Sequence, residues 1–288
     1  MTTVTSADGT EIAYDVTGDG PAVILVDGAL GFRAFGSAPA LAALLAPACR
    51  VHTYDRRGRG ESGDSGATPD ILEREVQDID AVIEAAGGLA SLYGISSGGA
   101  LVLEAAARLG ARVERVAVYE IPYDSTQAGV ASWRAYRSQL AQLLERGDRG
   151  GAAELFMRLV GASDDGVERM RQAPWWSTFE AVAPTLANDA AALGEDRIPP
   201  VERFRAIGVP ALVMDGSASL EHMPFMRASA ETLTRGLPNA RHEVLDGQAH
   251  EVDSQALAPL LVEFFAQAQR PDLPVGPRVP STELPGAE

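Results

Sequence analysis

The interpretation of this chain depends most on one stretch, Leu89-Ala90-Ser91-Leu92-Tyr93-Gly94-Ile95-Ser96-Ser97-Gly98-Gly99. It contains the pattern G-x-S-x-G, directly after a short apolar run and directly before an alanine-rich helical segment. A serine at such a strand-to-helix turn has a crowded backbone, so it requires small neighbours. The turn also points the free N–H groups of the helix at the serine, where they stabilise a developing oxyanion. Ser96 is therefore the predicted nucleophile, and the alternative is a glycine-rich turn that merely precedes a helix.

Short apolar runs alternate with helical patterns on both sides of this stretch. Ala22–Val26 and Val113–Tyr119 are continuous apolar runs, typical of strands that are buried on both faces. Between residues 69 and 86 the apolar positions recur at helical spacing. Further strands are expected at Ile12–Thr17, Val51–Tyr54, Ala211–Met214 and Glu243–Leu245, and further helices at Pro39–Leu45, Gly99–Leu109, Phe225–Arg235 and Leu257–Ala268. The alternation predicts βαβ units and a mainly parallel sheet, which is the α/β class.

The alternation stops between about Pro122 and Pro200, where the pattern is helical and includes all three tryptophans of the chain. We therefore expect a core domain formed by residues 1–121 and 201–269. Residues 122–200 are expected to form an inserted helical segment, which we call the lid. Residues 270–288 are rich in proline, and we expect a disordered tail there.

The composition excludes several classes of function. The formal net charge is −16, from 40 acidic and 24 basic side chains, so neither nucleic acid nor an anionic membrane is expected as a partner. Every basic side chain other than histidine is an arginine, which excludes Schiff-base chemistry and a Walker-type phosphate loop. No cofactor and no metal are expected, and no feature specifies an oligomeric state.

The cellular location is expected to be cytoplasmic. Cys49 is the only cysteine, so an internal disulfide is excluded. The first residues are polar and lack the basic and apolar regions of a signal peptide. No uninterrupted apolar run approaches the length that spans a bilayer.

A serine hydroxyl needs a base to become a nucleophile, and the chain offers four histidines. His52 lies inside a strand run, His242 at the start of the last strand, and His222 in a loop. His250 follows the last strand, where a short loop would place it at the carboxyl edge of the sheet. Because open α/β sheets bind their ligands at that edge, His250 is the predicted base.

Two charged clusters are expected to be structural. Asp78, Asp80 and Glu84 lie on an amphipathic helix, and a solvated face is expected there rather than a metal site. Arg56, Arg57 and Arg59 are close enough to bind an anion, but ion pairs that anchor a loop are the preferred interpretation.

Taken together, these motifs resemble the α/β-hydrolase superfamily from about Val4 to Ala268. The matching pieces are Asp27-Gly28-Ala29-Leu30-Gly31, Asp55-Arg56-Arg57-Gly58-Arg59-Gly60-Glu61-Ser62, the serine turn and the late histidine. The resemblance implies an eight-stranded, mainly parallel sheet flanked by helices, with the lid inserted after strand six. It also implies an oxyanion hole formed by the amide of Ser97 and one from Gly28 or Ala29. Most members have His-Gly where this chain has Asp27-Gly28.

The position of the acid departs from the commonest pattern of the superfamily. Most members place it a few residues beyond the seventh strand, where this chain has Ser219. Asp215 lies earlier, at the strand end, and remains the alternative. Glu120 follows the sixth strand, 24 residues after Ser96. Some haloalkane dehalogenases and the fungal zearalenone lactonases take their acid from that position, so the resemblance favours Glu120.

Acyl transfer to water is the expected reaction, because a serine nucleophile is unsuited to the alkyl-ester chemistry of dehalogenases and epoxide hydrolases of this fold. The resemblance to lactonases favours a hydrophobic ester or lactone. The residues expected to line the substrate pocket are Leu30, Tyr123, Trp133, Tyr136, Trp175 and Trp176, the alternative being that the aromatic ones form the core of the lid. Carbon–carbon hydrolysis, lyase chemistry and non-catalytic binding remain as competing hypotheses.

Overall fold

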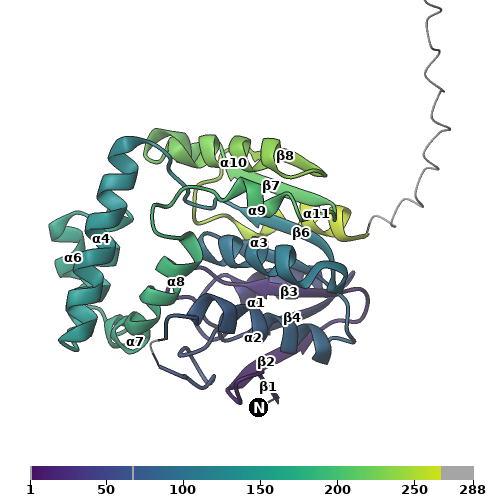
Figure 1. Ribbon diagram of the computed structural model, residues 1–288, viewed down its shortest axis with the longest axis horizontal. Coiled ribbons are helices and arrows are strands. Elements are labelled where there is room, and N and C mark those ends of the chain that lie inside the picture. The colour runs from purple at the N-terminus through teal and green to yellow at the C-terminus, as the bar shows by residue number, and fades with distance from the viewer. Residues whose placement is uncertain (1, 67, 267–288) are drawn as a thin grey trace, which may run out of the picture.

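The computed structural model describes residues 2–66 and 68–266, within which eight strands form one sheet (Figure 1). The strands are β1 (Thr2–Thr5), β2 (Glu11–Thr17), β3 (Ala22–Val26), β4 (Arg50–Tyr54), β5 (Ala90–Ile95), β6 (Val113–Tyr119), β7 (Ala211–Gly216) and β8 (Ala240–Leu245). Their order in the sheet is β1-β2-β4-β3-β5-β6-β7-β8. β2 is antiparallel to both of its neighbours, and the other adjacent pairs are parallel. The prediction of an α/β fold with a mainly parallel sheet is confirmed.

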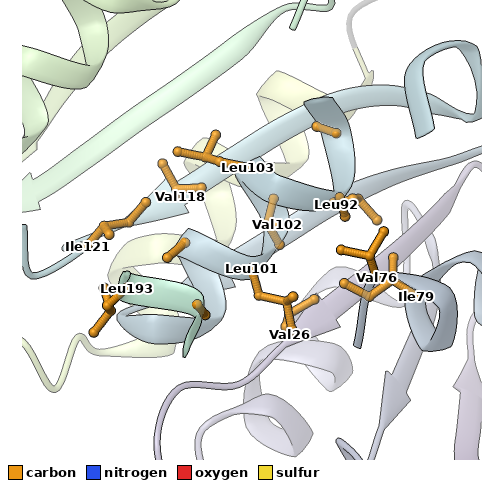
Figure 2. Close-up of a cluster of buried hydrophobic side chains, with 14 of the residues drawn as sticks. Val26, Val76, Ile79, Leu92, Leu101, Val102, Leu103, Val118, Ile121 and Leu193 are labelled. Carbon is orange, nitrogen blue, oxygen red and sulfur yellow. The ribbon is translucent and has the colours of Figure 1, made fainter. Parts of the chain in front are cut away.

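Helices cover both faces of the sheet. α2 (Ile71–Ala85), α3 (Ser97–Leu109) and α10 (Phe225–Gly236) pack on one face, and α1 (Ala38–Leu45) and α11 (Ser254–Ala266) on the other. Alternate residues of β3 belong to different cores: Ile24 lies in the first and Leu25 in the second. Figure 2 shows part of the first core, where Val26, Leu92 and Val118 from three strands lie among Leu101, Val102 and Leu103 of α3. The continuous apolar runs of the sequence are explained by this burial on both faces.

The lid lies between β6 and β7. Its helices are α4 (Gln127–Glu145), α5 (Arg149–Leu159), α6 (Asp164–Arg171), α7 (Trp176–Val182) and α8 (Leu186–Leu193), with a 3₁₀ turn η2 (Ala183–Thr185) before α8. Figure 1 shows α4, α6 and α7 at the left, beside the sheet, whereas α8 packs against α3. The short helix α9 (Val201–Phe204) then leads to β7. The proline-rich tail expected at 270–288 lies outside the described residues.

The expectation that the acidic side chains of α2 form a solvated face is wrong for Asp78. Its side chain is 1% exposed, and its two oxygens accept hydrogen bonds from Arg57 at 2.6 and 2.7 Å. Asp80 and Glu84 pair nearer the surface with Arg112. The loop after β4 packs against α2, so its arginines, rather than water, contact the carboxylates on the inner side of this helix.

In the ranges 2–66 and 68–266, none of the helices combines the length and the apolar character needed to cross a membrane.

Candidate active site

Ser96 occupies a strained turn between β5 and α3. Its backbone has φ 56° and ψ −130°, in a region that residues other than glycine rarely adopt. A hydrogen bond of 3.0 Å, in which the Ser96 N–H donates to the carbonyl of Tyr119, stabilises this strained backbone. Strain of this kind is typical of functional positions, because the surrounding structure must compensate for its cost.

The glycines around Ser96 leave no room for side chains. A Cβ atom on Gly94 would lie 2.5 Å from the carbonyl oxygen of Gly98, and one on Gly98 would lie 2.4 Å from the oxygen of Val26. A Cβ atom on Gly99 would lie 2.8 Å from a side-chain carbon of Ile121. The prediction that this turn requires small neighbours is therefore confirmed.

His250 and Glu120 form a hydrogen-bonded pair. The Nδ1 atom of His250 lies 2.9 Å from Oε2 of Glu120, and the N–H of Gly216 donates to Oε1 of the same carboxylate, also at 2.9 Å. The Glu120 side chain is fully buried, whereas that of His250 is 30% exposed. Because a carboxylate only accepts, the ring proton belongs on Nδ1, which leaves Nε2 as an acceptor. The backbone of Glu120 is also strained, with φ 45°.

The loop that bears His250 is held by two further hydrogen bonds. The hydroxyl of Tyr119 donates to the carbonyl of Ala249 at 2.7 Å, and the N–H of Ala218 donates to that of Gln248 at 2.9 Å. Tyr119 thus contacts both sides of the site, because its own carbonyl accepts from Ser96. These two contacts of Tyr119 were not predicted from the sequence, because no local motif distinguishes it from any other buried strand residue.

Asp215, the alternative acid, pairs with a different histidine. Its carboxylate accepts a 2.6 Å hydrogen bond from Nε of Arg227 and lies against Nε2 of His242. Ser219, at the position where most members of the superfamily have the acid, is buried in the 3₁₀ turn η3 (Ala218–Glu221). The structure therefore brings His250 together with Glu120, and Asp215 together with His242.

The two remaining histidines lie elsewhere in the structure. His52 is buried in β4 and stacks on Tyr14, with ring centroids 6.0 Å apart, and burial lowers its pKa to about 4. His222 lies directly after η3.

The loop after β3 lies against Ser96. A Cβ atom on Gly28 would lie 3.0 Å from Cβ of Ser96 and 3.6 Å from its hydroxyl oxygen. Within the described chain, no group accepts a hydrogen bond from the backbone N–H of Gly28, Ala29 or Ser97. The predicted oxyanion donors are thus unpaired, and Gly28 lies beside Ser96. Leu30, two residues further on, has φ 63°.

Asp27 is buried at the start of the same loop and is 9% exposed. A Cβ atom on Gly31 would lie 2.9 Å from its Cβ, and one on Gly36 would lie 3.2 Å from its Oδ2. Burial raises the pKa of Asp27 to about 6, even though the positive charges of Arg59 and Arg56 act in the opposite direction.

The arginines after β4 pair with buried carboxylates, as expected for anchors of a loop. Arg56 pairs with Glu75 on α2, and Arg57 with Asp78 on the same helix. Arg59 reaches the lid, where its guanidinium pairs with Asp189 on α8, and Arg56 pairs with the same carboxylate. Nothing in the sequence around Asp189 pointed to this contact.

The residues expected to line a pocket fall into two groups. Trp133 stacks on Tyr136 with ring centroids 5.2 Å apart, and both are buried in the larger core, together with Leu30 and Tyr123. Trp175 is 37% exposed and lies beside the buried Trp176. The ring of Phe179 contacts Trp175, Trp176 and Phe35, with centroid distances of 5.0, 6.1 and 5.3 Å. The second group therefore connects the lid with the loop after β3.

Across the part of the chain that the structure describes, no three His, Cys, Asp or Glu side chains are grouped so as to hold a metal ion.

Comparison with known proteins places this chain in a family. A sequence model described as "Alpha/beta hydrolase family" matches residues 23–256. A crystal structure of an alpha/beta hydrolase from Sphaerobacter thermophilus is 46% identical, with a TM-score of 0.81, and the match covers 92% of this chain and 100% of that one.

Two more distant structures share the fold. A thermophilic esterase from Thermogutta terrifontis is 22% identical over 91% of this chain and 97% of its own, with a TM-score of 0.66. An enol-lactonase from Burkholderia xenovorans is 21% identical over 92% of this chain and 100% of its own, also with a TM-score of 0.66.

Proposed function

The chain belongs to the alpha/beta hydrolase family, and we propose that it is a serine hydrolase which cleaves a carboxylic ester or lactone of a hydrophobic small molecule. The observation that carries this proposal is the buried Glu120 carboxylate hydrogen-bonded to His250, at the same end of the sheet as the strained Ser96. This arrangement leaves Nε2 of His250 to accept the proton of the nucleophile.

The reaction begins with attack of the Ser96 hydroxyl oxygen on the carbonyl carbon of the substrate. The hydroxyl proton passes to Nε2 of His250, and the Glu120 carboxylate stabilises the resulting imidazolium. When the tetrahedral intermediate collapses, the imidazolium gives this proton to the leaving alcohol. His250 then takes a proton from water, which attacks the acyl-enzyme. When this second tetrahedral intermediate collapses, the acid is released and the imidazolium returns the proton to the oxygen of Ser96.

The negative charge on the substrate oxygen needs donors that are in place before the reaction. The N–H of Ser97 is one, because it lies at the N-terminus of α3 and is unpaired. The second comes from Gly28 or Ala29 in the loop that contacts Ser96. Such donors contribute about 10²- to 10³-fold each to the rate.

The side chains around the site favour an apolar substrate. Phe35 and Phe179 join the loop after β3 to α7, and Trp175 at the edge of this group is partly exposed. An apolar acyl or alcohol group would contact these rings, and Leu30 and Tyr123 on the core side. Ester and lactone cleavage are the same acyl transfer, and the two distant structures are those of an esterase and an enol-lactonase.

The test is hydrolysis of p-nitrophenyl esters of increasing acyl length and of a resorcylic macrolactone, by the wild type and by Ser96→Ala. Ser138→Ala, an exposed serine on α4, is the matched control. We expect turnover to disappear in Ser96→Ala and to be unchanged in Ser138→Ala. Absence of any Ser96-dependent turnover would overturn the proposal in favour of carbon–carbon hydrolysis, a lyase or a non-catalytic binder.

A further inference from the structure

Asp189 lies on α8 of the lid, yet its carboxylate is buried beside the nucleophile turn. Its side chain is 6% exposed. Oδ1 accepts a 2.8 Å hydrogen bond from the hydroxyl of Ser97, the residue directly after the nucleophile. No step of the proposed reaction uses this carboxylate, so its place under the site needs another explanation.

Two arginines complete the surroundings of this carboxylate. Nη1 of Arg56 donates to Oδ1 of Asp189 at 2.6 Å, and Nη2 of Arg59 donates to Oδ2 at 2.7 Å. Burial by itself would raise the pKa of Asp189, but the charges of Arg59 and Arg56 and the Ser97 hydroxyl lower it overall. Asp189 is therefore a charged group that holds two guanidinium groups and one hydroxyl in fixed positions.

Both guanidinium groups also donate to the backbone of the loop after β3. Nη1 of Arg59 donates to the carbonyl of Gly28 at 2.6 Å, and Nη1 of Arg56 donates to that of Asp27 at 3.3 Å. A peptide group is planar, so its C=O and the N–H of the next residue point in opposite directions. Holding the Asp27 carbonyl therefore orients the N–H of Gly28, and holding the Gly28 carbonyl orients that of Ala29.

We propose that Asp189 is a positioning residue which sets the geometry of the oxyanion hole from both sides. It acts on the turn through the Ser97 hydroxyl, and on the loop after β3 through Arg59 and Arg56. Oxyanion donors must lie about 2.7–3.1 Å from the developing charge, and a displacement of about 1 Å costs about 10²-fold in rate. This inference rests on the proposed function, because acyl transfer develops the negative charge that the hole stabilises.

The test compares Asp189→Asn with Glu75→Gln. Glu75 is the other carboxylate on Arg56, at 2.7 and 2.8 Å, and its side chain is 1% exposed. Among the described residues Glu75 forms no hydrogen bond or ion pair with Ser97 or Arg59, so it controls for the loss of a buried charge on Arg56. The measurements are kcat and KM for p-nitrophenyl acetate, the inhibition constant of a trifluoromethyl ketone that forms a tetrahedral adduct, and the Tm.

We expect Asp189→Asn to lower kcat and the affinity for the ketone by the same factor, about 10- to 100-fold, with KM within about threefold of the wild type. Glu75→Gln is expected to lower the Tm while both constants stay within about threefold. A purely structural role for Asp189 predicts instead that the two variants lose kcat and ketone affinity equally. That result, or an Asp189→Asn enzyme with unchanged constants, would overturn the inference.

Ser97→Ala tests the inference if Asp189→Asn does not fold, because it removes one hydroxyl and leaves both arginine pairs intact. We expect kcat and ketone affinity to fall about three- to tenfold, and unchanged values would overturn the inference. Ser96→Ala separates the two proposals. If that variant retains turnover, the proposed function itself fails; if it loses turnover while Ser97→Ala and Asp189→Asn behave like the wild type, only the role of Asp189 fails.

Discussion

Replacing Glu120 with glutamine is expected to lower kcat by about 10³- to 10⁴-fold, or about 4 to 5 kcal/mol in the activation free energy. The reason lies in the two contacts of the carboxylate. One oxygen accepts from the N–H of Gly216, so the amide oxygen of a glutamine must take that position. The amide NH₂ then faces Nδ1 of His250, which must become an acceptor. The ring proton moves to Nε2, and the base can no longer take the proton of Ser96.

The assay is steady-state hydrolysis of p-nitrophenyl butyrate, with the Tm of each variant as a measure of folding. Asp215→Asn is the matched control, because Asp215 is also a buried carboxylate paired with a histidine, namely His242. This control is expected to lose stability and keep kcat within about threefold of the wild type. A Glu120→Gln enzyme within tenfold of the wild type would refute the reasoning, and so would an Asp215→Asn enzyme that loses as much activity as Glu120→Gln.

Two further predictions concern stability. The folded protein holds the pKa of Asp27 at about 6 instead of 3.8, so the wild type loses stability as the pH rises through this interval and the buried carboxyl ionises. Asp27→Asn should therefore be more stable than the wild type at pH 7.5, by up to about 3 kcal/mol in urea unfolding. This gain should fall below about 1 kcal/mol at pH 4, and an equal gain at both pH values would contradict the assignment. Gly98→Ala should lower the free energy of unfolding by about 2–4 kcal/mol, because its Cβ would lie 2.4 Å from the Val26 oxygen. Gly208→Ala has open space around the Cβ, so its free energy of unfolding should change little. Similar unfolding midpoints for the two glycine variants would show that the turn relaxes more easily than its contacts imply.

The parts of the fold that the sequence predicted correctly are those encoded by neighbouring residues. Buried strands such as Val113–Tyr119 are continuous apolar runs, and the turn at Ser96 is a motif of five adjacent positions. The polar edge strand Thr2–Thr5 was not predicted, because it is short and largely exposed and therefore lacks such a pattern. Glu120 was proposed because it directly follows a recognisable strand, at the position from which the dehalogenases and lactonases that this chain resembles take their acid.

The parts that the sequence did not predict depend on contacts between distant segments. The partner of Asp78 is a loop arginine, and a helical pattern alone cannot distinguish a carboxylate facing Arg57 from one facing water. Asp189 lies in an unremarkable alanine-rich segment, 92 residues from Ser97 and 130 from Arg59. Only the folded chain brings these groups together.

The buried carboxylate on α8 has a mechanical consequence for how substrate enters. Although α8 belongs to the lid by sequence, Asp189 joins it to the nucleophile turn, and Thr185 at the preceding turn accepts a further 2.9 Å hydrogen bond from Arg59. Swinging α8 outward would break these bonds and pull on Ser97 and on the loop that contains Gly28. The lid is therefore divided: α8 is bound to the core domain, and any opening that leaves Ser97 and the loop containing Gly28 in place must take place in α4 to α7.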